Sequence, residues 1–284
     1  MWTQIAHQIA ELTGKDFCVV SCKPVSGGCI NQGYAVSDGD RTYFVKLNQA
    51  SQVAMFEAET IGLNQILSTA TIRVPKPIAW GATNSAYLVL EWLELGQGNT
   101  PSWEKMGRQL AAMHRITSIK GFGWDQNNHI GSTPQINNWT ADWAEFYTKH
   151  RLGYQFQLAA RRGGNFPQQK QLLATIPQLL THEIQPSLVH GDLWGGNAGF
   201  TMSEPVIFDP AIYFGDREVD IAMTELFGGF PTAFYSGYNQ VFPLSSGYER
   251  RKTIYNLYHV LNHFNLFGGS YESQANRMIA QILS

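Results

Sequence analysis

The 284-residue chain has 44% hydrophobic and 15% charged residues and a formal net charge of −2, which is typical of a globular protein with a sizeable core. Without a basic excess, we expect no nucleic-acid partner and no membrane partner. No apolar stretch approaches the ~20 residues that span a bilayer, and the first residues lack a signal-peptide pattern. The cysteines Cys18, Cys22 and Cys29 show no CxxC spacing. We therefore expect a cytoplasmic protein without a zinc site or a disulfide framework.

The first third of the chain predicts a small antiparallel sheet. The pattern favours a helix over residues 3–12, strands over 17–22, 33–37 and 42–47, a helix over 53–67, and strands near 78–81 and 87–92. The turn Asp38-Gly39-Asp40 joins the second and third strands, because Asp-Gly supplies the positive φ of a tight hairpin. Residues 1–93 are thus expected to form an N-terminal lobe with five strands and one main helix.

The remainder, residues 94–284, is predicted to be mostly helical. Helices are expected over 103–116, 138–153 and 168–182, and over most of the chain beyond residue 220. Two short apolar runs, 187–190 and 205–208, bracket a polar loop and are expected to be strands. The fold class is therefore α+β, with a sheet-containing lobe followed by a helical one.

The polar loop carries the strongest chemical signal. Asp192 is followed by Asn197 five residues later, and Asp209 comes at the end of the next short strand. This pattern is typical of phosphoryl transfer, where one carboxylate accepts the proton of the attacking hydroxyl. An Asn and a second Asp supply the hard oxygen ligands that Mg²⁺ prefers. The alternative, a polar turn with capping Asp and Asn residues, explains any one of them but not the whole segment.

The N-terminal lobe contains a candidate phosphate anchor. Lys46 lies in a predicted strand between apolar neighbours, where a buried ammonium needs an anionic partner. ATP phosphates and a helix carboxylate fit that need, and we favour Glu59 over Glu57 as the carboxylate. The alternative is a lysine that reaches solvent at the edge of the sheet.

Two further segments could bind the nucleotide. Backbone N–H groups of Gly27, Gly28 and Cys29 could cover phosphates, because glycine permits close approach. Backbone groups of Glu91, Trp92 and Leu93 could bind the adenine edge, although a plain buried strand is an equal alternative. The glycine segment lacks a GxGxxG pattern, so its nucleotide contacts are the weaker prediction.

The chain resembles the fructosamine kinase (ketosamine-3-kinase) family, in the aminoglycoside-phosphotransferase-like branch of the protein-kinase fold. The segments that carry the resemblance are Gly27–Asn31, Phe44–Lys46, Met55–Glu59, Leu188–Asn197, Phe208–Ala211 and Tyr213–Asp220. The Asp192-to-Asn197 spacing alone is typical of kinase-like proteins in general. The run from Leu193 to Gly196 and the run from Gly215 to Glu218 are specific to the fructosamine kinase branch.

The resemblance implies a two-lobed kinase-like fold that binds ATP and Mg²⁺ between its lobes. It implies that Asp192 is the catalytic base, that Asn197 and Asp209 are metal ligands, and that Lys46 and Glu59 anchor phosphate. Asp220 would orient the catalytic loop without reacting. Asp209 is followed by Pro-Ala instead of Phe-Gly, so control by a phosphorylated activation segment is not expected.

The implied reaction is phosphorylation of the 3-hydroxyl of a ketosamine on a glycated protein or amino acid. The product is unstable and releases the amine, which makes the activity a protein-deglycation repair. Ribulosamines, erythrulosamines and fructosamines remain open as substrates. A kinase for an aminoglycoside or choline and an inactive kinase-like scaffold are the alternatives.

Three residues in these segments have competing interpretations. Trp194 could stack on the substrate sugar or pack the catalytic loop. His190 is expected to hydrogen-bond the loop backbone rather than act as the base. Cys29 could be oxidised, because a phosphate-binding loop lowers a thiol pKa, and the chain could then be a disulfide-linked dimer instead of a monomer; otherwise it is a small residue that fits the loop. Cys18 and Cys22, four apart on one expected strand, are predicted to be buried.

Overall fold

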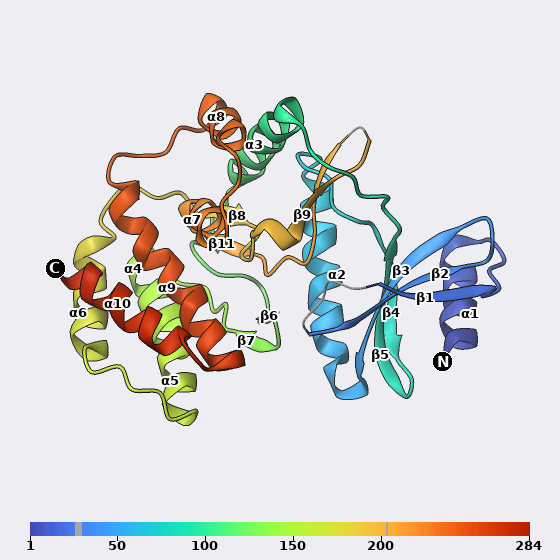
Figure 1. The fold of residues 1–284 in the computed structure, drawn as a ribbon, viewed down its shortest axis with the longest axis horizontal. Coiled ribbons are helices and arrows are strands. Elements are labelled where there is room, and N and C mark those ends of the chain that lie inside the picture. The colour runs from blue at the N-terminus through green and yellow to red at the C-terminus, as the bar shows by residue number, and fades with distance from the viewer. Residues whose placement is uncertain (26–29, 203) are drawn as a thin grey trace. The chain divides into compact units, whose positions relative to one another are not determined.

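The computed structural model describes residues 1–25, 30–202 and 204–284. The chain forms two compact units (Figure 1). Unit 1 comprises residues 1–102 and 196–210, and unit 2 comprises residues 103–195 and 211–284. These ranges differ from the expected ranges 1–93 and 94–284 mainly because the segment 196–210 joins unit 1. The assignment of nucleotide binding to one lobe and catalysis to the other stays a prediction.

Unit 1 is built on a five-stranded antiparallel sheet with the strand order β1-β2-β3-β5-β4. Its elements are α1 (Trp2–Thr13), β1 (Ser21–Val25), β2 (Gln32–Ser37), β3 (Thr42–Gln49), η1 (Ala50–Gln52), α2 (Val53–Ser68), β4 (Pro77–Ala82), β5 (Ser85–Glu91), β9 (Ala198–Phe200) and β10 (Pro205–Ile207). The predicted five strands and main helix are confirmed. Gly39 has φ of 104° in the β2–β3 hairpin, as an Asp-Gly turn requires.

The sheet of unit 1 is covered on both faces, by α1 on one and by α2 on the other (Figure 1). Because side chains alternate along a strand, Val45 and Leu47 of β3 join Ile5 and Ile9 of α1 in one apolar cluster. Lys46, between them, therefore points to the opposite face, which α2 covers. The alternation of side chains along β3 thus places the charged Lys46 on the face covered by α2.

The first strand was predicted too early in the chain. The strand β1 begins at Ser21, opposite Ser37, and not at Phe17. Phe17 is buried against Tyr43 in the α1 cluster, so its apolar character reflects core packing and not strand pairing. The prediction that Cys18 and Cys22 are buried is also wrong, because Cys18 is exposed and Cys22 is half-buried.

Unit 2 is mostly helical. Its elements are α3 (Thr100–His114), β6 (Asn128–Ile130), β7 (Thr133–Gln135), α4 (Trp143–Phe146), the π-helix η2 (Tyr147–Gly153), α5 (Tyr154–Arg161), α6 (Gln169–Leu179), β8 (Ser187–Val189), η3 (Gly195–Asn197), β11 (Tyr213–Gly215), α7 (Glu218–Leu226), α8 (Thr232–Val241), α9 (Tyr248–Phe267) and α10 (Tyr271–Leu283). The helices α3 and η3 cross the boundaries between the units, because α3 begins in unit 1 and η3 ends in it. The α+β class is therefore confirmed.

The helix expected from residue 138 begins later. Thr140 pairs with Phe122 through two backbone hydrogen bonds, so residues before it are extended. The Asp142 side chain then accepts the N–H of Glu145 at 2.7 Å and caps α4, as Asp commonly does at an N-cap. The start of the helix is thus set by a capping residue inside the predicted range.

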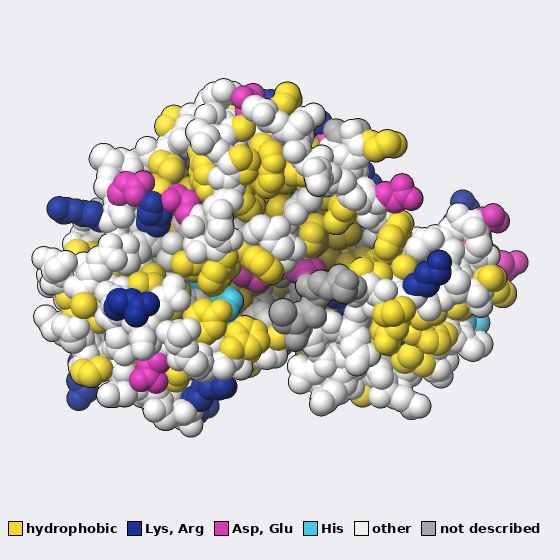
Figure 2. All heavy atoms as spheres, viewed as in Figure 1, with side chains coloured by type: hydrophobic (Ala, Val, Ile, Leu, Met, Phe, Trp, Pro, Cys, Tyr) yellow, Lys and Arg dark blue, Asp and Glu magenta, His cyan; other side chains and the backbone are white. Residues whose placement is uncertain are grey.

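The surface of the molecule mixes apolar and charged groups. On the face drawn in Figure 2, hydrophobic side chains reach the surface in both units, and Lys and Arg side chains lie singly or in small groups. None of the helices in the described ranges is long and apolar enough to cross a membrane.

Candidate active site

The anchor cluster of unit 1 consists of Lys46, Glu59 and Asp209. The Nζ atom of Lys46 lies 2.6 Å from Oε1 of Glu59 and 2.5 Å from Oδ1 of Asp209. Glu59 faces the sheet because it lies four residues after the buried Met55 and four before the buried Leu63 on α2. Glu57 is exposed, so Glu59 is the carboxylate that pairs with Lys46.

The charges of the anchor cluster stabilise one another. Burial alone would lower the pKa of the Lys46 ammonium, but the nearby Asp209 and Glu59 carboxylates outweigh burial and raise this pKa. Burial raises the pKa of Glu59, and the Lys46 ammonium opposes that shift. One ammonium thus pairs with two carboxylates. In such an arrangement an arriving anion can replace a carboxylate beside the ammonium, and an arriving cation can replace the ammonium beside a carboxylate.

The β9–β10 hairpin brings the two predicted metal ligands to one end. Ala198 pairs with Ile207, and the Phe208 N–H donates to the Asn197 carbonyl at 3.0 Å. Asn197 therefore precedes β9 at the end where Asp209 follows β10. Asn197 is buried, whereas the Asp209 side chain is 45% exposed and the residue has a positive φ of 58°. The two side chains offer the oxygen donors that Mg²⁺ prefers.

The segment after β5 is fixed through the side chain of Glu91. Its Oε1 accepts a bond from Arg73 at 2.6 Å, and its Oε2 accepts the Lys76 N–H at 3.2 Å. Trp92 and Leu93 follow the strand and are half-buried. The Glu91 carboxylate is therefore engaged within unit 1, and contacts to adenine would come from backbone groups.

The glycine segment is outside the described residues. Gly27, Gly28 and Cys29 belong to residues 26–29, so the predicted phosphate contacts and the predicted redox role of Cys29 stay predictions.

In unit 2, Asp220 holds the loop that carries Asp192. Its carboxylate accepts the N–H of His190 at 2.6 Å and the N–H of Gly191 at 2.8 Å. The Asp192 N–H in turn lies 3.3 Å from Nδ1 of His190. Gly191 has φ of 82°, and a Cβ atom there would lie 2.2 Å from the Ala211 carbonyl oxygen. The loop conformation therefore requires glycine at this position.

Behind Asp220 lies a second set of partners, His114 and Tyr238, which we call the loop support together with Asp220. The His114 Nε2 atom lies 3.0 Å from Asp220 Oδ2, and its Nδ1 atom lies 2.7 Å from the Tyr238 hydroxyl. Burial opposes ionisation of Asp220, but the bond to His114 and the Gly191 N–H lower its pKa. The carboxylate is thus held as an anion under the loop.

The sequence interpretation did not identify His114 or Tyr238. Both are buried and lie 106 and 18 residues away from Asp220 along the chain. A signal existed for His114, since it follows Leu110 by four residues on the buried face of α3. A histidine at an apolar helix position needs a polar partner.

Trp194 lies two residues after Asp192 and is 38% exposed. Its backbone N–H donates to the Asp192 carbonyl at 3.2 Å. An indole this exposed does not belong to the buried core, and its role in sugar binding stays a prediction.

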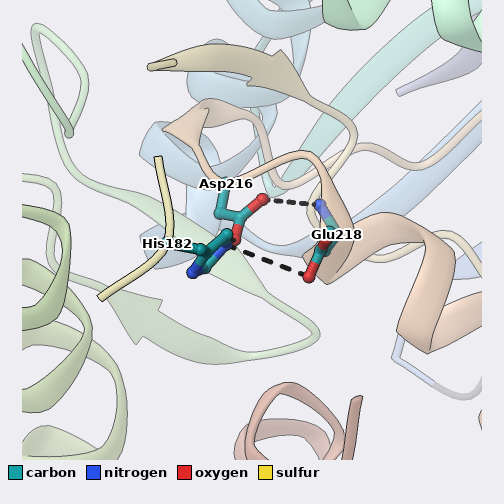
Figure 3. A group of neighbouring side chains, drawn as sticks. All are labelled: His182, Asp216 and Glu218. Atoms are coloured by element: carbon teal, nitrogen blue, oxygen red, sulfur yellow. Dashed lines mark hydrogen bonds and ion pairs between the residues drawn. The ribbon is translucent and has the colours of Figure 1, made fainter. Parts of the chain in front are cut away.

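A second cluster of charged groups lies at the start of α7 (Figure 3). The His182 Nε2 atom lies 2.7 Å from Asp216 Oδ2 and 4.0 Å from Glu218 Oε2. These three residues could hold a metal ion. Arg251, however, donates to both oxygens of Glu218, at 2.7 and 2.8 Å, and Tyr255 donates to Asp216 at 2.5 Å. The cluster therefore fixes the start of the helix that carries Asp220.

The sheet topology, the strand lysine paired to a helix carboxylate and the Asp-containing loop define a kinase-like fold. A thermostable mutant of an aminoglycoside phosphotransferase, in complex with AMP-PNP and hygromycin B, has this fold, with a TM-score of 0.68, 14% identity and coverage of 99% of this chain and 98% of that one.

The family follows from closer relatives. The profile of the fructosamine kinase family matches residues 1–284. A Synechocystis protein named "Probable ketoamine kinase" is 56% identical over 99% of this chain and 97% of its own length. The chloroplastic protein-ribulosamine 3-kinase of Arabidopsis thaliana is 42% identical over 95% of this chain and 85% of its own. A candidate fructosamine-3-kinase structure from Haemophilus somnus has a TM-score of 0.94 at 33% identity, covering 100% and 98% of the two chains. The chain belongs to the fructosamine kinase family and is a kinase.

Proposed function

We propose that the chain transfers the γ-phosphate of ATP, with Mg²⁺, to the 3-hydroxyl of a ketosamine on a glycated protein or amino acid. The names of the relatives support the substrate class, because they refer to ketoamines and protein ribulosamines. The observation that carries the proposal is the anchor cluster, in which Lys46 bonds both Glu59 and Asp209.

Each candidate residue has a separate role in the proposed reaction. Asp192 accepts the proton of the 3-hydroxyl as that oxygen forms its bond to the γ-phosphorus, and the bond to the β,γ-bridging oxygen breaks to release ADP. Lys46, held by Glu59, binds phosphate oxygens. Asn197 and Asp209 would hold Mg²⁺, which neutralises the charge of the phosphates when bound. Backbone groups of Glu91 to Leu93 would bind adenine.

Fewer residues are assigned to the part of the site that would bind the ketosamine. Trp194 would stack on the apolar face of the sugar, which tolerates different amine groups beyond it. His190 and Asp220 position the loop and do not touch substrate. The product, a ketosamine 3-phosphate, decomposes and frees the amine, so the proposed role is protein repair.

ADP release from Mg-ATP and ribulosamine-modified lysine tests the function. The wild type is expected to turn over, and Asp192→Asn is expected to lose at least about 1,000-fold in kcat, because it loses the base. Asp125→Asn, the same change at an exposed residue of unit 2, serves as the control and should match the wild type.

The outcomes separate the alternatives. Turnover on an aminoglycoside or choline, with none on ribulosamine, erythrulosamine or fructosamine, would replace the substrate class. ATP-dependent thermal stabilisation without turnover on any acceptor would indicate an inactive scaffold.

A further inference from the structure

The β6–β7 hairpin of unit 2 carries the buried amide side chains of Asn128 and Gln135, and a third buried amide, Asn137, follows β7 by two residues. Buried amides are costly unless their donors and acceptors are bonded. Asn137 donates to Asn128 at 2.8 Å, and Asn128 donates to the Ile212 carbonyl at 2.8 Å. The hairpin is therefore hydrogen-bonded to the chain that follows Asp209 and Pro210.

Gln135 is the member of this network with the most direct connection to the candidate active site. It is 1% exposed. Its Nε2 atom donates to the Ala211 carbonyl at 2.9 Å and to Asn128 Oδ1 at 2.8 Å, and its Oε1 atom accepts the Tyr258 hydroxyl at 2.7 Å. Two acceptors on one side and a donor on the other fix the orientation of the amide.

The partner of Gln135, Ala211, also holds the catalytic loop. The Ala211 N–H donates to the His190 carbonyl at 2.8 Å. Its carbonyl lies so close to Gly191 that a Cβ atom there would be 2.2 Å away. The same peptide segment is thus held by Gln135 on one side and packs against the two residues before Asp192 on the other.

We propose that Gln135 is a positioning residue of the catalytic loop, which it holds through the carbonyl of Ala211. This inference rests on the proposed role of Asp192 as base. Without the amide, the Ala211 carbonyl loses its buried donor, and the segment that packs against Gly191 can shift. A shift of Asp192 by a fraction of an ångström lowers the rate of the chemical step more than it lowers nucleotide binding.

Asn262 provides a matched control. It is a buried amide on α9 that donates to the Ile130 carbonyl of the same hairpin at 3.4 Å and accepts a bond from Gln155 Nε2 at 3.3 Å. Asn262→Leu therefore reports the loss of a buried amide at the hairpin, and Gln135→Leu adds the loss at Ala211.

The experiment compares both variants in kcat, in KM for ATP, in thermal midpoint and in amide hydrogen exchange of the segment 188–193. Gln135→Leu is expected to lower kcat about 10- to 100-fold, with KM for ATP within about twofold of wild type and faster exchange of the segment. Asn262→Leu is expected to keep kcat within about threefold at a similar loss of thermal midpoint. Equal loss of kcat in both variants, or wild-type kcat and exchange in Gln135→Leu, would overturn the proposal.

A second variant tests the donor itself and applies even if Gln135→Leu does not fold. In Gln135→Glu, a protonated carboxyl can donate to the Ala211 carbonyl, whereas a carboxylate cannot. Because burial raises a carboxyl pKa, the activity of this variant relative to wild type should rise as the pH falls from 8 to 6. A ratio that does not change with pH would contradict the role of the donor.

Failure of the proposed function would be visible separately. If the wild type phosphorylates no ketosamine, the function fails. The present proposal is then decided by amide hydrogen exchange of the segment 188–193 in Gln135→Leu and Asn262→Leu. Exchange that is faster in Gln135→Leu but not in Asn262→Leu is the expected result. Equal exchange in the two variants would contradict the proposal.

Discussion

In unit 1, Lys46 bonds two carboxylates, whereas in unit 2 Asp220 bonds two backbone N–H groups and one histidine. The anchor cluster thus consists of side-chain ion pairs that can exchange when a phosphate or a cation binds. The loop support holds the backbone itself, so the loop is preorganised before substrate arrives. We therefore expect variants of the anchor cluster to change mainly nucleotide binding, and variants of the loop support to lower kcat and stability together.

Asp220→Asn should have the largest effect of the variants that probe this difference. Removal of a buried charge that accepts three hydrogen bonds is expected to cost about 3 kcal/mol or more in the free energy of unfolding and about 100-fold in kcat. Urea unfolding and steady-state kinetics measure the two losses. Asp125→Asn, on the surface of the same unit, controls for the substitution. A stable Asp220→Asn protein with wild-type kcat would contradict the loop support.

Gly191→Ala should also destabilise unit 2 strongly. The methyl group would meet the Ala211 carbonyl in addition to the strain of a positive φ, for a cost of about 2–5 kcal/mol. Gly163 has nearly the same φ, 83°, but nothing lies within 4 Å of an added Cβ atom. Gly163→Ala should therefore cost only the strain, about 1–2 kcal/mol. Equal unfolding midpoints for the two variants would show that the close approach to Ala211 does not matter.

Glu59→Gln tests the anchor cluster of unit 1. Lys46 keeps Asp209 but loses the carboxylate that holds it toward phosphate, so KM for ATP is expected to rise about tenfold. The neighbouring Glu57→Gln changes an exposed residue of the same helix and should leave KM unchanged. A rise in KM of the same size in both variants would argue against the anchor cluster.

The pH dependence of stability should show a smaller contribution from His259 in unit 2. Burial, with a smaller effect of His263, lowers the pKa of His259 to about 3. Because the unfolded histidine binds a proton below about pH 6.5 and the folded one does not, stability is full above that pH and falls as the pH drops toward 3. One such group costs about 2 kcal/mol between pH 6.5 and 5.

Urea unfolding at the two pH values measures this loss, and His259→Asn should reduce it. His7→Asn, an exposed histidine of α1, should not change it. An unchanged pH dependence in His259→Asn would show that the buried imidazole does not stay neutral in the folded state.

The sheet of unit 1 was predicted correctly because it rests on local patterns, and the candidate-site segments, whose roles stay predictions, were identified from local patterns too. The alternation of β3, the Asp-Gly turn and the spacing of Asp192, Asn197 and Asp209 can be identified from residues close together in the chain. The predicted start of the first strand was wrong, because an apolar run does not distinguish core packing from strand pairing.

The resemblance implied a supporting role for Asp220, but its partner His114 and the contact of Gln135 with Ala211 were not predicted, because they depend on long-range contacts. His114 reaches Asp220 across 106 residues, and Gln135 reaches Ala211 across 76. The bridges Arg73–Val206 and Gly96–Phe200, which connect the segment 196–210 to the rest of unit 1, likewise have no local signal. Single-residue patterns carry no information on which distant partner satisfies a buried polar group.

The position of the transferred phosphate tests the proposed function most directly. Wild-type protein is incubated with Mg-ATP and ribulosamine-modified lysine, and the product is followed by phosphorus–proton correlated NMR. The proposed function predicts phosphate on O3 of the sugar, followed by release of free lysine. Phosphate on another hydroxyl, or consumption of ATP without a phosphorylated ketosamine, would contradict it.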